Sequence, residues 1–199
     1  MNVKLLVQIQ KLRPQLRDSN GFLYAAPVGQ VLCGFVFERI RGFRRIWKFA
    51  LPLYDRVEFL HLGFSAVVGQ WEGKAMTPKV EAARFVECIA NHEPETYSWA
   101  DPEKFLSISE RQDTLGNPWN RRGAALTRIV LGDASAAKSH LRILLDDNHI
   151  DRVPCFRRDL EQIDALLKQG VNPARQLLMR WKKQTMARFG LVPKAGESC

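Results

Sequence analysis

Residues 63–67 come closest to a catalytic motif in this sequence. They read G-F-S-A-V, which is the beginning of a G-x-S-x-G nucleophile elbow around Ser65. That elbow ends on a glycine because the chain turns sharply from strand to helix after the serine. The β-branched Val67 occupies the glycine position here. We therefore interpret Ser65 as a residue of a continuing strand.

A glycine-containing stretch with a lysine follows at residues 69–74, with the sequence G-Q-W-E-G-K. A phosphate-binding loop has four residues between its glycines and a Ser or Thr after its lysine, where the hydroxyl binds Mg²⁺. This stretch is one residue too short, and Ala75 stands at the hydroxyl position. We interpret it as a loop that follows the sheet.

The histidines do not form a metal-binding pattern. His140 and His149 are nine residues apart, whereas two zinc ligands on one helix face are four residues apart. His61 has apolar neighbours in a predicted strand, and we interpret it as a half-buried structural histidine. The sequence therefore predicts neither a metal site nor a cofactor.

Two basic segments are the candidate binding sites. The first is a predicted hairpin in which cations alternate with aromatic residues, a combination suited to phosphate contact or base stacking. Its candidate residues are Arg39, Arg41, Arg44, Arg45, Trp47 and Lys48. The alternative is a sheet edge that its charges protect against aggregation.

The second basic segment is the last predicted helix. Its candidate residues are Arg175, Arg180, Lys182, Lys183 and Arg188. Leu178, Trp181 and Thr185 form a stripe along the same helix. A basic amphipathic helix can bind an acidic partner or a membrane surface, or it can simply dock on its own domain with its cations near the negative helix end.

The net charge of +9 is distributed unevenly along the 199 residues. Residues 1–73 have a net charge of +5 and residues 171–199 also have +5, whereas residues 74–117 have −3. The positive charge is therefore concentrated near the two ends of the chain, where it could attract an acidic partner. A generally basic surface is the alternative interpretation.

The first half of the chain predicts a helix followed by strands. Apolar residues at helical spacing indicate a helix over residues 3–17. Alternating apolar and aromatic residues then indicate strands, which we place at 22–26, 31–38, 47–53 and 57–68. Because their connections are too short for parallel crossovers, we expect a four-stranded antiparallel meander.

Helices dominate the second half. Capping residues and N-terminal prolines predict them at 77–91, 102–112, 119–131, 134–147, 154–168 and 173–189, with a loop over 92–102. Strands followed by helices argue for the α+β class. We predict an α+β sheet domain over residues 1–91 and a helical subdomain over 92–199, with packing as one domain as the alternative.

Residues 119–147 resemble one tetratricopeptide helix pair. The residues that resemble the repeat are Ala124-Ala125, Leu131-Gly132-Asp133 and Ala136-Ala137. The small residues among them would allow the two helices to pack closely. No second copy follows at the expected period of about 34 residues, so the sequence predicts no repeat array.

Composition favours a soluble, cytoplasmic protein. No apolar run reaches the roughly 18 residues that span a bilayer. The four cysteines, Cys199 among them, are widely spaced without a C-x-x-C pair, which indicates free thiols.

The absence of a catalytic motif favours a non-enzymatic protein that binds another macromolecule. We expect a protein partner and a toxin-neutralising or adaptor role. The alternative is nucleic-acid binding through the two basic segments. A third hypothesis is an enzyme whose site is assembled from dispersed residues such as His61, Ser65 and Arg45. The oligomeric state is not predicted.

Overall fold

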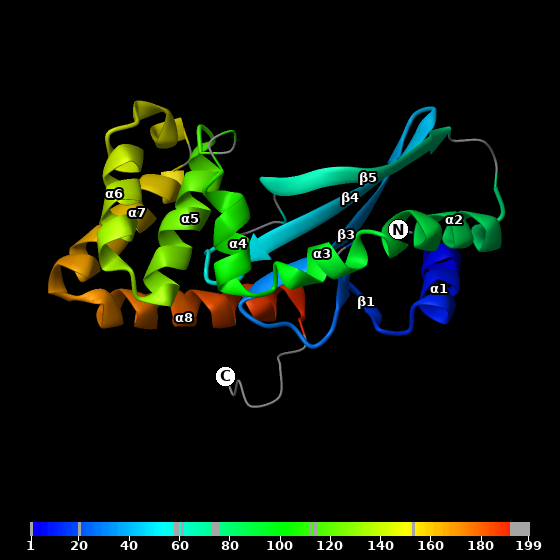
Figure 1. Ribbon diagram of the computed structural model, residues 1–199, viewed down its shortest axis with the longest axis horizontal. Helices are drawn as coiled ribbons and strands as arrows, with labels where there is room; N and C mark the ends of the chain where they lie inside the picture. The colour runs from blue at the N-terminus through cyan, green and yellow to red at the C-terminus, as the bar shows by residue number, and fades with distance from the viewer. Residues whose placement is uncertain are drawn as a thin grey trace.

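The protein has an α+β architecture, seen in a computed structural model that describes residues 2–19, 21–57, 60, 62–72, 76–111, 113, 115–152 and 154–191 (Figure 1). The first part comprises α1 (Val3–Leu12), β1 (Leu16–Ser19), β2 (Phe22–Ala25), β3 (Val31–Ile40), β4 (Phe43–Pro52) and β5 (Phe64–Glu72). The second part comprises α2 (Pro78–Ala90), α3 (Glu93–Ser98), α4 (Pro102–Ser109), α5 (Pro118–Leu131), α6 (Ala134–Leu145), the 3-10 helix η1 (Asn148–Arg152), α7 (Pro154–Gln169) and α8 (Val171–Phe189).

The N-terminal helix is shorter than the sequence predicted, and a strand follows it. Proline disfavours helical geometry in the residue before it, and Arg13 has left the helical region ahead of Pro14. The chain then extends, and Leu16 pairs with Ala25 of β2. The prediction of a helix to residue 17 and of four strands was therefore wrong, because the sheet has five strands.

The last strand is also displaced from its predicted position. β5 begins at Phe64 and continues to Glu72, so residues 69–72 belong to the sheet and not to a loop. A bulge opposite Ile46 and Trp47 lets the pairing continue to the end of the strand. A Cβ atom on Gly69 would lie 2.8 Å from the Cys88 sulfur of α2. This glycine therefore allows a helix to approach the strand closely. Residues 73–75 and His61 lie outside the described residues.

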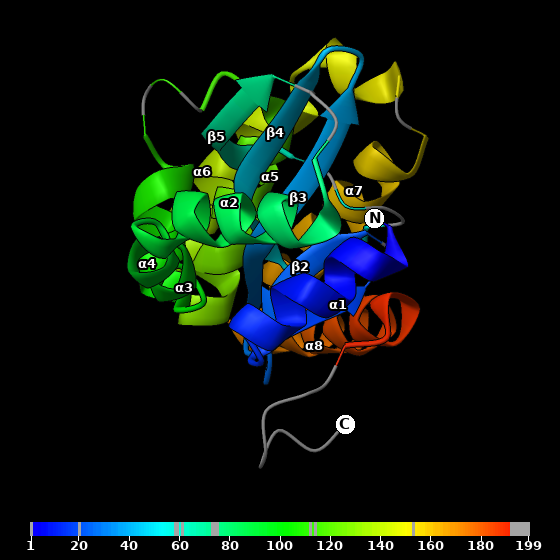
Figure 2. The same ribbon diagram turned by 90° about the vertical axis from the view of Figure 1, so that its right-hand side faces the viewer.

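The five strands form an antiparallel meander in the order β1-β2-β3-β4-β5. We call the face that packs against α1 and α2 the inner face, and the opposite one the outer face. Inner-face residues such as Phe35, Phe37 and Ile46 form one apolar core with Leu5 and Phe85 of these helices. Figure 2 shows α1 and α2 side by side in front of the sheet.

The end of α8 covers one half of the outer face. Met186 and Phe189 of this helix pack with Phe22, Leu32 and Phe49 of the sheet. The opposite half of the outer face, toward the turn between β3 and β4, extends away from the helical bundle (Figure 1).

The helices of the second half confirm the predicted pattern, with two additions, α3 and η1. α3 lies within residues 92–102, which were predicted as a loop. The predicted caps Thr77 and Asp133 accept hydrogen bonds from the first turns of α2 and α6. The helices from α4 through α8 share a large apolar core, which also contains Val31 and Phe64 of the sheet. The division into domains at residue 91 stays a prediction.

Helix α5 approaches the sheet at a glycine. A Cβ atom on Gly123 would lie 2.6 Å from the ring of Phe64. One turn later, Thr127 shares a buried hydrogen bond of 2.7 Å with the Tyr54 hydroxyl. The small residue and the polar pair together fix how α5 sits against the end of β4 and the start of β5.

A buried charge cluster ties the sheet to the helices. Arg122 of α5 is 2% exposed and contacts two carboxylates, Asp55 after β4 at 2.7 Å and Asp159 of α7 at 3.1 Å. Arg56 pairs with Asp159 from its other side, and Thr185 of α8 donates to the backbone oxygen of Asp55. Two cations therefore balance two anions, and every member comes from a different element or turn except the neighbours Asp55 and Arg56.

We expect Arg122→Met to lower the free energy of unfolding by about 3–5 kcal/mol, because it leaves Asp55 buried without its cation and leaves Asp159 with Arg56 alone. Lys168→Met is the matched control, since Lys168 is 72% exposed in its pair with Asp164, and it should cost at most about 0.5 kcal/mol. Urea denaturation of both variants measures the difference. Equal stability of the two variants would show that the buried cluster does not hold the helices to the sheet.

Candidate functional site

The predicted cations of the hairpin divide between the two faces of the sheet. Arg39 and Arg44 are opposite each other in β3 and β4, and both reach the buried carboxylate of Glu81 in α2. The distances are 2.7 Å from Arg39 and 3.0 Å from Arg44. These two arginines therefore hold α2 against the hairpin.

Lys48 has a similar internal role. Its side chain is buried, its ammonium group donates to Glu95 of α3 at 2.5 Å, and the same group lies 4.7 Å from the centre of the Trp99 ring. A lysine between a carboxylate and an indole face is satisfied both electrostatically and by cation–π contact. This contact anchors α3 to the inner face.

The outer face holds the rest of the hairpin site. The indole N–H of Trp47 donates to Glu38 at 3.0 Å, and the Arg45 guanidinium lies 5.4 Å from the Trp47 ring. Arg45 also donates to Gln70 of β5 at 3.1 Å. Arg41 is exposed in the turn between β3 and β4. Trp47 is therefore held in one orientation at the surface.

The cations of the last helix do not gather on one surface. Lys182 is buried and Arg175 is half-buried, whereas Arg180 and Lys183 are exposed. Arg188 donates to the backbone oxygen of Val57 at 3.0 Å and ties the helix end to the sheet. Leu178, Trp181 and Thr185 are buried, so this helix docks on its own protein. Figure 1 places α8 well apart from the turn between β3 and β4.

Sequence reasoning missed an apolar surface beside the arginines. Ile40 and Phe43 are opposite each other at the end of the hairpin, and Val67 is opposite Trp47. Their exposed fractions are 37% for Ile40, 44% for Phe43 and 46% for Val67. Period-two alternation places all of them on the outer face. We call Ile40, Phe43, Arg45, Trp47 and Val67 the outer-face patch.

The signal for this patch was present in the alternation of the strands. The predicted strands end at residue 38 and resume at residue 47, so Phe43 falls in the connection between them and has no predicted face. In the structure Phe43 is the first residue of β4. Both a strand boundary and the pairing with β5 were needed to bring it onto the same face as Val67.

Of the three residues named in the enzyme hypothesis, the structure describes Ser65 and Arg45, and each is engaged with a partner outside that set. The Ser65 hydroxyl donates to the backbone oxygen of Leu62 at 2.7 Å, and Arg45 is engaged with Gln70. Within the described residues, no three His, Cys, Asp or Glu side chains come together as metal ligands. Cys33, Cys88 and Cys155 are free thiols, and Cys199 lies outside the described part of the chain.

A surface cavity of about 390 Å³ lies between the start of α5 and the end of α6. Arg121, Ile143, Asp146 and Asp147 are among the residues that line it. None of the predicted binding residues contributes to this cavity. It therefore adds no support to the predicted sites.

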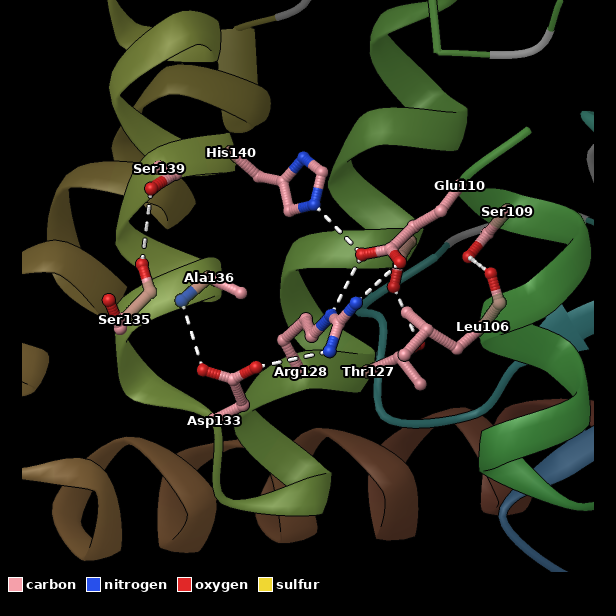
Figure 3. A network of polar contacts seen from close by, with 11 residues as sticks. Leu106, Ser109, Glu110, Thr127, Arg128, Asp133, Ser135, Ala136, Ser139 and His140 are labelled. Carbon is pink, nitrogen blue, oxygen red and sulfur yellow. Dashed lines mark hydrogen bonds and ion pairs between the residues drawn. The ribbon is translucent and has the colours of Figure 1, made fainter. Parts of the chain in front are cut away.

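A polar network connects the helices α4, α5 and α6 (Figure 3). Glu110, which caps α4, accepts from Arg128 at 2.6 and 2.8 Å and contacts His140 at 3.0 Å. Arg128 also reaches Asp133, the cap of α6. The Arg128 hydrogen bonds, aided by His140, lower the pKa of Glu110.

Comparison with known proteins identifies no relative: no protein family, curated protein or solved structure matches the chain. Among the described helices, none is long and apolar enough to cross a membrane. The functional interpretation therefore depends on the geometry of the chain itself.

We expect Glu110→Gln to lower the free energy of unfolding at pH 7 by about 1–2 kcal/mol, because it removes charge-assisted hydrogen bonds. The native pKa lies below the unfolded value, so this stabilisation is complete above about pH 4.3. It disappears as the pH falls through the native pKa. Urea denaturation at several pH values measures the gap between the wild type and the variant.

The control is Asp113→Asn, because this carboxylate is 63% exposed in its pair with Arg111. Its stability gap should be small at every pH. A gap for Glu110→Gln that stays constant on acidification would contradict the lowered pKa.

Proposed function

We propose that this chain is a non-enzymatic protein-binding module, of the toxin-neutralising or adaptor kind, and that it binds its partner through the outer-face patch. The observation that carries this proposal is the exposure of Ile40, Phe43 and Val67 together on one face. Apolar side chains that gather on an uncovered surface mark an interaction site more often than scattered ones do.

The composition of the patch supports a protein as the partner. Tryptophan, other aromatic residues and arginine dominate the residues that contribute most to protein–protein binding. Trp47 is held by Glu38 and Arg45, so little side-chain entropy would be lost when a partner covers it. Arg41 and Arg45 lie beside the apolar residues, and Glu38 and Glu72 lie on the same face, so a partner would meet charges of both signs around the apolar side chains.

The nucleic-acid alternative has weaker support from the geometry. Arg39, Arg44 and Lys48 already contact carboxylates of α2 and α3. A phosphate would have to compete with these internal partners. Exposed Arg180 and Lys183 lie on α8, away from the hairpin, so few of the predicted binding cations remain to follow one nucleic-acid backbone.

Immobilised protein tests the proposal when it is incubated with native lysate. We expect one specific chain to be retained by the wild type and lost, by about tenfold or more, with Phe43→Asp, because a charge is costly to bury in an interface. The matched control is Val3→Asp on α1, since Val3 is 73% exposed. Retention of the same chains by all three proteins, or by none, would contradict the proposal.

The wild type and the same two variants also distinguish nucleic-acid binding from protein binding. Binding to DNA or RNA releases counterions, so it predicts strong retention at low salt that falls steeply as salt rises. We expect no such retention on immobilised DNA or RNA. Salt-dependent retention that Phe43→Asp leaves unchanged would favour nucleic-acid binding over the proposed function.

A further inference from the structure

The two edges of the sheet are built differently. β1 has four residues, and Arg17 and Asp18 are exposed along it. β5 has nine residues and pairs with β4 on one side only. Short edges and edge charges are devices that keep a sheet from pairing with other chains. The β1 edge has both devices, whereas the β5 edge is long and its one charged residue is Glu72 at the end of the strand.

The β5 edge is uncharged over most of its length. From Phe64 to Trp71 the strand contains no charged residue and no proline. Ala66, Val67 and Gln70 are exposed along it. A bulge can also keep a sheet edge from pairing with another chain. In β5 the bulged residue is Val68, and its side chain packs toward the core of α1 and α2. The strand therefore remains extended on both sides of the bulge.

No described element occupies this edge. α2 crosses the inner face, where Cys88 lies against Gly69, and in Figure 1 the far side of β5 has no ribbon along it. Between described residues, the backbone hydrogen bonds of Phe64 to Trp71 run to β4. Alternate backbone N–H and C=O groups therefore point outward, and an extended chain is the structure that satisfies such a row.

We propose that β5 is the docking edge for an extended segment of an acidic partner protein, which joins the sheet as a sixth strand. The inference rests on the proposed protein-binding function and adds the mode of docking. Val67 belongs both to this edge and to the outer-face patch, so a strand added here continues the exposed apolar surface. The partner residue opposite Val67 is uncharged, because cross-strand neighbours on one face are in contact.

Charge favours a different protein over a second copy of this chain. Each copy has a net charge of +9, and two such chains repel each other as they approach. An acidic protein is attracted by the same field. Main-chain hydrogen bonds then provide affinity for the added strand, and the side chains at alternate positions provide specificity.

A library of phage-displayed random peptides of about twelve residues, long enough to cover the strand, provides the probe. The library is panned on the full chain, and enriched sequences are then measured as synthetic peptides. We expect enrichment of sequences with an uncharged, β-branched or aromatic centre. Their affinity should fall about tenfold or more with Val67→Lys, because lysine protects an edge from pairing.

The matched control is Val80→Lys on α2, where Val80 is 54% exposed. It should leave peptide affinity unchanged. The proposal is overturned if no peptide is enriched, or if Val67→Lys and Val80→Lys give equal affinities. A lysate partner lost with Phe43→Asp but no enriched peptide would remove strand addition and leave the proposed function intact.

A pair of proline variants tests the backbone directly. Ser65→Pro and Ala66→Pro affect neighbouring residues, whose N–H groups point to opposite sides of the strand. One variant loses a hydrogen bond to β4 and the other loses an outward donor. We expect the variant with the higher free energy of unfolding to have lost peptide binding. Full binding by that variant would contradict strand addition.

A second copy remains a distinct outcome of the test. Light scattering after size exclusion, at the concentration used for panning, measures the mass of the wild type. We expect the mass of one chain. A dimer that Val67→Lys dissociates would assign the β5 edge to self-association and overturn the proposal of an acidic partner.

Discussion

Burial of the Arg122 guanidinium between Asp55 and Asp159 determines how the sheet and the helices are joined. One carboxylate follows β4, the other lies on α7, and the arginine comes from α5. Removing charges from water is costly, so this arrangement persists only while all partners are in place. The turn after β4 is also tied to α8 through Thr185 and Arg188. The end of α8 can then cover only one half of the outer face.

Pairing of cations with carboxylates inside the protein also explains why few of the predicted binding cations are free. Arg39 and Arg44 hold α2 through Glu81, and Lys48 holds α3 through Glu95. The acidic middle of the chain, residues 74–117, supplies these carboxylates. Basic and acidic segments that are distant in sequence therefore meet across the inner face. The outer face beyond α8 keeps its exposed apolar side chains.

Local sequence signals predicted much of the fold. Caps and prolines predicted most of the helices, and alternation predicted β2, β3 and β4. Predictions were wrong where a single residue or a tertiary contact decides the outcome. Pro14 ends α1 early, and the bulge in β5 extends a strand through residues that resemble a loop. The partner of Arg39 lies 42 residues away, so local spacing could not distinguish a structural arginine from a binding one. The outer-face patch depends on the register of three strands, which the sequence alone does not determine.

In the proposed complex the outer-face patch, and not the cationic helix α8, faces the partner. Photocrosslinking in cells tests it most directly, with a photoreactive amino acid placed at Phe43 in one variant and at Arg180 in another. Both positions are exposed, so both can react with a bound chain. We expect one discrete protein adduct from position 43 and none from position 180. A protein or nucleic-acid adduct from position 180 without one from position 43 would contradict it.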